Sequence, residues 1–194
     1  RWIRTLRDHT GLMMENRTPL GDDELLIHIR AGDIFSSKPH GFYAQPPLMF
    51  YQETIRHFEP RVVHLVYEND LNPVIRSLKK VLSLDNTEVR EHSGALREDV
   101  SVILSAKTLV AGYGTFVPGI LALSEYAKTV YTFQKPLDSV SLPHIKNWVK
   151  QDEFGLYRRL MLQGNWKNKS WQRWLMIAYP NRFLSRDWLE YEHS

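Results

Sequence analysis

The sequence predicts an α/β domain in which a mainly parallel, five-stranded sheet lies between layers of helices. Short apolar segments of strand length alternate along the chain with helical segments of about ten residues. Strands separated by such helices pair in parallel through right-handed crossovers, which places helices on both faces of the sheet. The 194 residues, 43% hydrophobic and 24% charged, suffice for one good core. These observations together predict a Rossmann-like, three-layer domain.

Five segments are predicted as strands because they are short and mostly rich in apolar or β-branched residues. They are residues 25–30, 62–68, 87–92, 108–113 and 129–133. The segments between them are predicted as helices over residues 46–58, 72–82, 97–106 and 116–127. Pro46-Pro47 and Asn72-Pro73 mark two of the helix starts, because proline is tolerated in the first turn of a helix.

The chain divides into three predicted parts. Residues 1–24 are expected to form a helical lead-in and a polar loop, a possible remnant of an acceptor domain, and residues 25–140 the Rossmann-like domain. Residues 141–194 contain five tryptophans and are predicted as helices packed on the flank of that domain. Because the chain begins with arginine and not methionine, we expect it to be part of a longer protein.

The composition argues against several classes of protein. There are no cysteines, which excludes disulfides, thiol catalysis and cysteine-based zinc sites. The net charge of +3 gives no reason to expect nucleic-acid binding. No apolar run approaches the roughly 20 residues that span a bilayer. The histidines show no metal-ligand spacing, and no Gly-x-Ser-x-Gly turn supplies a hydrolase nucleophile.

Arg30 lies at the carboxyl end of the first predicted strand, where ligands bind in open parallel sheets. His28 lies two residues earlier, so both side chains point to the same face of the sheet. A guanidinium offers paired donors that match a phosphate, and it keeps its charge at any working pH. Arg30 is therefore a candidate for binding a diphosphate. The alternative interpretation is that it pairs with Asp33 or with a helix carboxylate and only fixes a loop.

The fourth predicted strand leads into the sequence AGYGTFVPG, residues 111–119. Gly112 and Gly114 leave room for a ligand to approach the backbone closely, and Thr115 stands where a helix N-cap is expected. A helix N-terminus with free N–H groups and a hydroxyl can bind an anion. The alternative is an ordinary capped helix after a glycine turn.

Asp99 lies in the first turn of the predicted helix 97–106, where the helix dipole stabilises a carboxylate without any further function. The functional alternative is that this carboxylate accepts hydrogen bonds from a purine ring N–H and amino group, as guanine offers. After the second strand, the residues 68–70 either contact a ribose or an acceptor sugar or cap the next helix, and we favour the cap for Asp70. His40, Tyr43 and Gln45 either line a sugar pocket or belong to a structured loop.

Two motifs, HIRAGD at 28–33 and REDVSVILSAKTLVAGYGTF at 97–116, resemble the nucleotide-binding half of GDP-fucose-dependent fucosyltransferases of the GT-B type. That group includes α-1,2-, α-1,6- and protein O-fucosyltransferases, and the resemblance covers roughly residues 25–133. It implies that Arg30 binds the β-phosphate of GDP and stabilises it as the leaving group. It also implies that His28 lies beside the phosphates or the sugar and that Asp99 recognises guanine.

The remaining nucleotide-binding residues that the resemblance implies are Thr115, Phe116, Gly114 and Ser105. The implied reaction is an inverting transfer of fucose from GDP-fucose to a glycan or protein acceptor, without metal or other cofactor. Its compartment would be the Golgi lumen in a eukaryote and the cytoplasm in a bacterium or virus. Two features depart from the family pattern. Ala31 stands where the α-1,2 and α-1,6 enzymes usually have a second arginine, which leaves the linkage open, and only about two dozen residues precede the first motif, where an acceptor-binding domain is expected.

Two other functions remain open on the sequence. The chain could be a catalytically inactive module that binds a nucleotide-sugar or a glycan. It could also be a different nucleotide-dependent α/β enzyme, such as a sugar-phosphate transferase, which would require magnesium.

Overall fold

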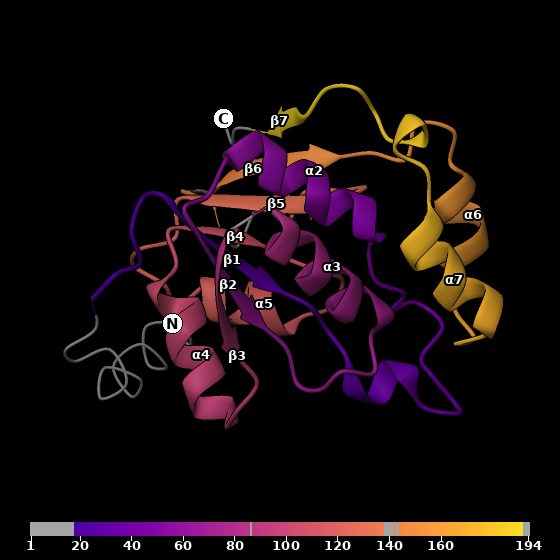
Figure 1. Ribbon diagram of the computed structural model, residues 1–194, viewed down its shortest axis with the longest axis horizontal. Coiled ribbons are helices and arrows are strands. Elements are labelled where there is room, and N and C mark those ends of the chain that lie inside the picture. Colours follow the sequence, from indigo (N-terminus) through magenta and orange to yellow (C-terminus); the bar gives the residue numbers. More distant parts are fainter. Residues whose placement is uncertain (1–17, 86, 138–141, 143, 192–194) are drawn as a thin grey trace.

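A computed structural model describes residues 18–85, 87–137, 142 and 144–191 of the chain (Figure 1). Its seven-stranded sheet has the strand order β3-β2-β1-β4-β5-β6-β7. The five predicted strands are all present and parallel, as β1 (Glu24–His28), β2 (Val62–Val66), β3 (Glu88–His92), β4 (Thr108–Val110) and β5 (Thr129–Phe133). The predicted fold class, a mainly parallel Rossmann-like sheet, is therefore confirmed. Most of the lead-in predicted for residues 1–24 lies outside the described residues.

Two further strands correct the prediction of a helical segment over residues 141–194. Strand β6 (Lys146–Lys150) pairs in parallel with β5, and β7 (Leu189–Tyr191) pairs antiparallel with β6. The sheet therefore has seven strands and not five. Neither segment has an apolar run in its sequence, since β6 reads Lys-Asn-Trp-Val-Lys and β7 reads Leu-Glu-Tyr.

The four helices predicted between the strands are confirmed, with one shorter than expected. They are α2 (Leu48–Phe58), α3 (Pro73–Leu84), α4 (Leu96–Ser105) and α5 (Phe116–Leu121), so that α5 ends at Leu121 and not at residue 127. The C-terminal segment adds α6 (Leu156–Met161) and α7 (Ser170–Ala178), which lie side by side at one end of the molecule in Figure 1. Two short 3-10 helices, η1 (Gly32–Phe35) and η2 (Asn181–Phe183), complete the described elements.

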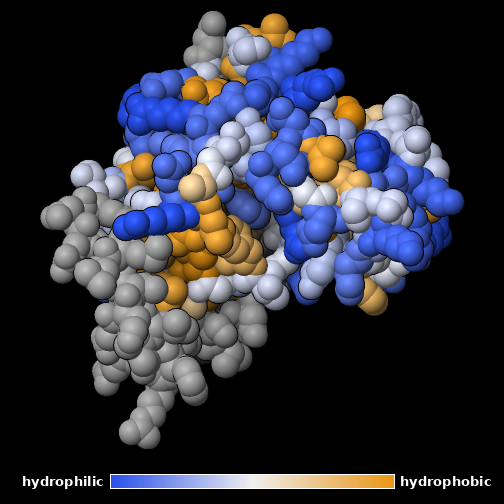
Figure 2. Space-filling view, turned by 90° about the horizontal axis from the view of Figure 1, so that it is seen from below, coloured by the Kyte–Doolittle hydropathy of each residue, from blue (hydrophilic) through white to orange (hydrophobic). Residues whose placement is uncertain are grey.

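Two apolar cores lie on opposite faces of the sheet, as the alternation of side chains along a strand requires. Leu25 and Ile27 of β1 belong to a core covered by α2, α3, α6 and α7. Leu26, between them, belongs to the other core, which α4 and α5 cover. With the large apolar side chains mostly inside, hydrophilic residues dominate the face of the molecule in Figure 2, which also shows one larger hydrophobic area and several separate hydrophobic residues. No helix in the described part of the chain is long and apolar enough to cross a membrane.

The strand order of the sheet reverses between β1 and β4. From β1 the chain moves outward through β2 to β3, then returns to β4 on the other side of β1 and continues to β5 and β6. Ligands of open α/β sheets bind at the carboxyl ends of the strands where the order reverses in this way. The loop after β1, which carries Arg30, and the turn after β4, residues 111–115, flank this point.

Candidate functional site

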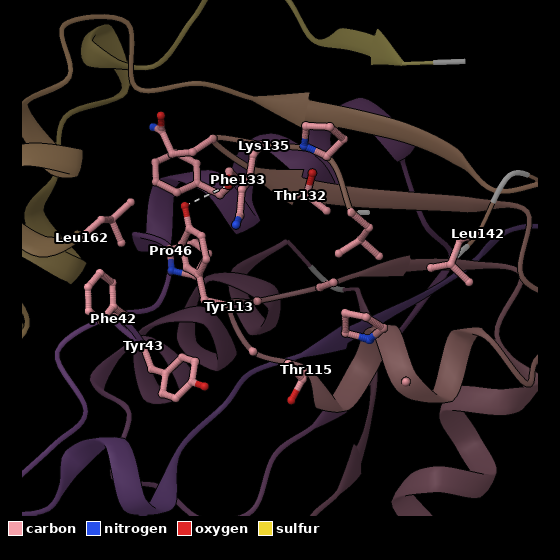
Figure 3. A pocket seen from close by; sticks show the side chains of 18 of the residues that line it. Phe42, Tyr43, Pro46, Tyr113, Thr115, Thr132, Phe133, Lys135, Leu142 and Leu162 are labelled. Carbon is pink, nitrogen blue, oxygen red and sulfur yellow. Dashed lines mark hydrogen bonds between the residues drawn. The ribbon is translucent and has the colours of Figure 1, made fainter. Parts of the chain in front are cut away.

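A pocket of about 850 Å³ opens at the carboxyl ends of β4 and β5 (Figure 3). Its volume falls within the range of roughly 300–1,000 Å³ that is usual for small-ligand sites. The turn after β4, the loop after β5 and residues of α5 line it on one side. Opposite them lie Phe42, Tyr43 and Pro46 from the loop that precedes α2, and Arg158, Leu162 and Gln163 from α6 and the residues after it.

Arg30 lies beside this pocket and contacts two of its lining residues. Its guanidinium lies over the ring of Tyr43, 4.5 Å from the ring centroid. It also donates to both carboxylate oxygens of Asp33 at 3.1 Å, so the loop-fixing ion pair considered from the sequence does form. The Asp33 side chain is 73% exposed, and an ion pair in that setting contributes at most about 1 kcal/mol to stability.

Gly114 allows Arg30 to approach the turn after β4. Its φ of +140° is a backbone conformation that residues with a side chain rarely adopt, and a Cβ there would lie 3.0 Å from Nη1 of Arg30. The sequence predicted that this glycine leaves room for a ligand to approach the backbone. In the structure, the side chain of Arg30 occupies that room.

His28, the last residue of β1, packs against Phe116, the first residue of α5. Their ring centroids are 5.5 Å apart, and the rings are tilted by 41°. The Nδ1 atom of His28 is shielded from solvent and has no hydrogen-bond partner among the described residues. Burial, followed by the charge of Arg30, lowers the pKa of His28 from 6.5 to about 4, so the ring is neutral at physiological pH.

This lowered pKa predicts a pH-dependent contribution to stability. In the unfolded chain His28 titrates near 6.5, so between pH 6.5 and 4 the unfolded state binds a proton that the native state does not. The free energy of unfolding should therefore fall as the pH decreases through this window. We expect His28→Gln to reduce that fall by roughly 2–3 kcal/mol, measured by urea unfolding at pH 6.5 and 4. An equal fall in both proteins would contradict the role of His28.

The three residues predicted to line a sugar pocket occupy different positions. Tyr43 lines the pocket. His40 is exposed and packs on Tyr43, with ring centroids 4.7 Å apart, but it is not part of the pocket lining. Gln45 is fully buried behind the wall, where its amide donates to the carbonyl oxygens of Tyr43 at 2.9 Å and Tyr113 at 3.0 Å. Gln45 therefore joins the two walls of the pocket and does not line it.

The turn after β4 is also shaped by Gln45. A Cβ on Gly112 would lie 2.3 Å from the Oε1 atom of Gln45, so only glycine fits beside this buried amide. Thr115 is the N-cap residue of α5 and lines the pocket, but its side chain makes no capping hydrogen bond. The glycine turn and the helix that begins after Thr115 are present as expected, but α5 has only six residues, and anion binding at its N-terminus stays a prediction.

The loop after β2 supports Arg30 from the other side. Asn72 caps α3 by accepting a hydrogen bond from Val74 N, and its amide donates to the carbonyl oxygen of Arg30 at 2.9 Å. Asn69 accepts a bond from the backbone N–H of Gly32. The prediction that Asp70 caps this helix is therefore wrong, because Asn72 supplies the cap.

The C-terminal segment holds the loops that carry Arg30 and Tyr43. The hydroxyl of Tyr157 donates to the carbonyl oxygen of Gln45 at 2.7 Å. The indole N–H of Trp166 donates to the carbonyl oxygen of Ile34, also at 2.7 Å, and the amide of Asn168 donates to that of Phe35 at 2.6 Å. Residues more than a hundred positions apart in the sequence therefore fix one wall of the site.

Asp99 and Ser105 lie at opposite ends of α4. Asp99 is in the first turn, and α4 follows the parallel strand β3, so Asp99 lies at the same sheet edge as Arg30. Its Oδ1 atom is shielded and has no hydrogen-bond partner among the described residues, and burial is the main cause that raises its pKa. Ser105 is the last residue of the helix, its hydroxyl donates to the carbonyl oxygen of Ser101, and Thr108 begins β4 just after it. Ser105 therefore lies toward the opposite edge and does not join the other predicted residues.

Two charged residues of the pocket were not predicted, Lys135 and Arg158. Lys135 is the second residue after β5, so the rule that ligands bind at strand ends could have identified it. Arg158 could not have been found in this way, because its position depends on how α6 packs against the loop before α2. Among the described residues there is no group of three or more His, Asp or Glu side chains that could hold a metal ion.

No protein-family model matches the sequence, and no curated protein matches it. Two solved structures of POFUT1, a GDP-fucose protein O-fucosyltransferase, resemble the fold. The complex with GDP has a TM-score of 0.43 and 10% sequence identity over 67% of this chain and 47% of that chain. The complex with GDP-fucose has a TM-score of 0.34 and 11% identity over 56% of this chain and 37% of that chain. The chain thus spans about half the length, or less, of the structures it matches.

Proposed function

We propose that this chain binds GDP-fucose and acts in the inverting, metal-independent transfer of fucose to a glycan or protein acceptor. The observation that carries the proposal is the position of Arg30 where the strand order reverses, against Gly114 and beside a pocket that can hold a small ligand. A guanidinium in that position can bind two phosphate oxygens at once. The motif resemblance around residues 28–33 and 97–116 supplies the identity of the donor.

The proposed chemistry is stabilisation of a leaving group. An acceptor hydroxyl attacks C1 of fucose and loses its proton to solvent water, while the bond between C1 and the β-phosphate oxygen breaks on the opposite face of the sugar. Negative charge then develops on the phosphate that Arg30 binds, and a fixed donor aimed at such a developing charge lowers the barrier. The pair with Asp33 and the ring of Tyr43 hold the guanidinium in place before the donor arrives.

Asp99 is proposed to select guanine. Its shielded Oδ1 atom lacks a donor among the described residues, which is expected of a carboxylate whose donors arrive with the ligand. The ring N–H and amino group of guanine present two neighbouring donors, whereas adenine and uracil do not offer this pair. The nucleotide would then extend along the sheet edge, from Asp99 at the start of α4 to Arg30 after β1.

Calorimetric titration with GDP, UDP and ADP tests the donor assignment. We expect GDP to bind at least about tenfold more tightly than the other two, because a nucleotide without this pair of donors leaves the shielded Oδ1 atom of Asp99 unsatisfied, at a cost of roughly 1–3 kcal/mol. Stronger binding of UDP or ADP, or binding of none of them, would refute it.

Transfer is tested separately, by incubating the chain with GDP-fucose and a glycan array in the presence and absence of EDTA. Binding of GDP without transfer or donor hydrolysis would reduce the proposal to a nucleotide-sugar-binding module. Activity that is lost with EDTA would favour a magnesium-dependent enzyme instead.

A further inference from the structure

We propose that Lys135 is a second cationic residue that binds the donor diphosphate, opposite Arg30 across the turn formed by residues 111–115. This inference rests on the proposed function and extends it, because it assigns a binding role to a residue that neither the motifs nor the family resemblance includes. It follows from the position of Lys135, from its lack of a partner and from the charges that line the pocket.

Position is the first observation. Arg30 follows β1 and Lys135 follows β5, while β4 lies between these two strands in the sheet. Neighbouring strands are about 4.8 Å apart, so the two chain positions are separated by roughly 10 Å across the sheet edge. Two long cationic side chains at that separation can reach a common anion above the turn after β4. Figure 3 shows the side chain of Lys135 pointing into the pocket, toward Tyr113.

The second observation is that Lys135, which lines the pocket, has no polar partner among the described residues, whereas Lys107, Lys146 and Lys150 at other strand ends do. Lys107, just before β4, pairs with Asp22 at 3.0 Å. Lys146, at the start of β6, pairs with Glu190 at 2.5 Å, and Lys150, at its end, donates to the carbonyl oxygen of Arg186 at 3.0 Å. Lys135 alone of these four lines the pocket, and its ammonium remains available to a ligand.

The third observation is the charge of the pocket. Its described lining contains Lys135 and Arg158 but no aspartate or glutamate. A concave site with one sign of charge and apolar walls concentrates ligands of the opposite charge. The pocket therefore suits an anion attached to a less polar body, which is the chemistry of a nucleoside diphosphate sugar.

Lys135 and Arg30 would have different tasks. The planar guanidinium of Arg30 can fix the orientation of one phosphate through two parallel hydrogen bonds, while the ammonium of Lys135 acts as a compact point charge. A diphosphate carries more negative charge than one guanidinium neutralises. A second cation at the site would allow the donor to bind without a divalent metal ion, and Ala31, next to Arg30, cannot supply that charge.

The test compares Lys135→Met with Lys128→Met, since these two exposed lysines flank β5 at its opposite ends. Both substitutions remove one positive charge and keep most of the apolar stem, but only Lys135 is at the pocket. The affinities of GDP, guanosine and inorganic pyrophosphate are measured for both variants and the wild type. We expect Lys135→Met to weaken GDP and pyrophosphate binding about tenfold or more, since a hydrogen bond to a charged group is lost. Guanosine binding should be unchanged, and Lys128→Met should bind all three ligands like the wild type.

The outcomes separate this inference from the proposed function. If the wild type binds pyrophosphate through Lys135 but does not prefer GDP over UDP and ADP, the guanine assignment fails and the role of Lys135 stands. If Lys135→Met binds GDP and pyrophosphate as tightly as the wild type, the role of Lys135 is refuted. Equal losses in Lys128→Met and Lys135→Met would also refute it, because the effect would then come from net charge. A wild type that binds neither GDP nor pyrophosphate overturns both proposals.

Discussion

Arg30→Ala is expected to reduce fucosyl transfer by a factor on the order of 10²–10³, because it removes a donor aimed at charge that develops in the transition state. The fold should be little affected. The ion pair with Asp33 lies at an exposed edge, so its loss should lower the free energy of unfolding by about 1 kcal/mol or less. Arg30→Lys should restore little activity, because lysine keeps the charge but cannot present two donors in one plane.

Arg56→Ala is the matched control. Arg56 also pairs with a carboxylate three residues away, Glu53, but it lies in the last turn of α2, far along the helix from its start near the pocket. GDP affinity, transfer rate and melting temperature should be measured for both alanine variants. If Arg30→Ala melts well below the wild type and still binds GDP normally, Arg30 only fixes its loop and the proposed phosphate binding is wrong.

Trp166→Ala is expected to have the largest effect on stability, lowering the free energy of unfolding by about 3–5 kcal/mol. The indole is fully buried, packs edge-on against Phe35 at 5.5 Å between ring centroids, and satisfies the carbonyl oxygen of Ile34. Removing it leaves both a cavity and an unpaired carbonyl. For a chain of this length the melting temperature should fall by roughly 10 °C. GDP binding should weaken as well, because the loop between Arg30 and Tyr43 loses its support.

Trp174→Ala serves as the control for this prediction. This substitution also replaces a tryptophan by alanine, but Trp174, on α7, is 65% exposed. Surface substitutions of this kind usually change stability by no more than about 0.5 kcal/mol. Similar losses in the two variants, measured by denaturant unfolding, would show that the burial of Trp166 does not stabilise the site as described.

The parts of the fold that could be predicted are those whose residues carry their own local signal. Strands such as Val62–Val66 are buried throughout and rich in valine, and Asn72-Pro73 marks a helix start by the chemistry of its side chain and ring. Strand β6 has no such signal. Its Lys150 is only 1% exposed because Arg186, from a later part of the chain, supplies a carbonyl oxygen and Trp188 supplies a ring face. Such a strand becomes recognisable only once its tertiary partners are known.

The same distinction holds for the candidate site. The strand-end rule drew attention to Arg30 and Gly114 from the sequence, and the structure places them in contact. The rule does not distinguish a side chain that lines a pocket from one that supports its wall, so Gln45 was assigned to the pocket and Lys135 was overlooked. Ser105 was included through the family resemblance alone, which takes no account of which end of α4 it occupies.

The bonds from the C-terminal segment to the early loops have a consequence for the order in which the protein is completed during synthesis. The donor for the carbonyl oxygen of Ile34, Trp166, lies 132 residues later in the chain. The donor for the carbonyl oxygen of Gln45, Tyr157, lies 112 residues later. Strands β1 to β5 can pair as soon as residue 133 has left the ribosome, yet the loop that carries Arg30 lacks its buried partners until Trp166 and Asn168 have emerged. Contacts so distant along the chain form slowly, because the intervening chain must first be ordered. A nascent chain should therefore pair strands β1 to β5 well before the loop that carries Arg30 is fixed in place.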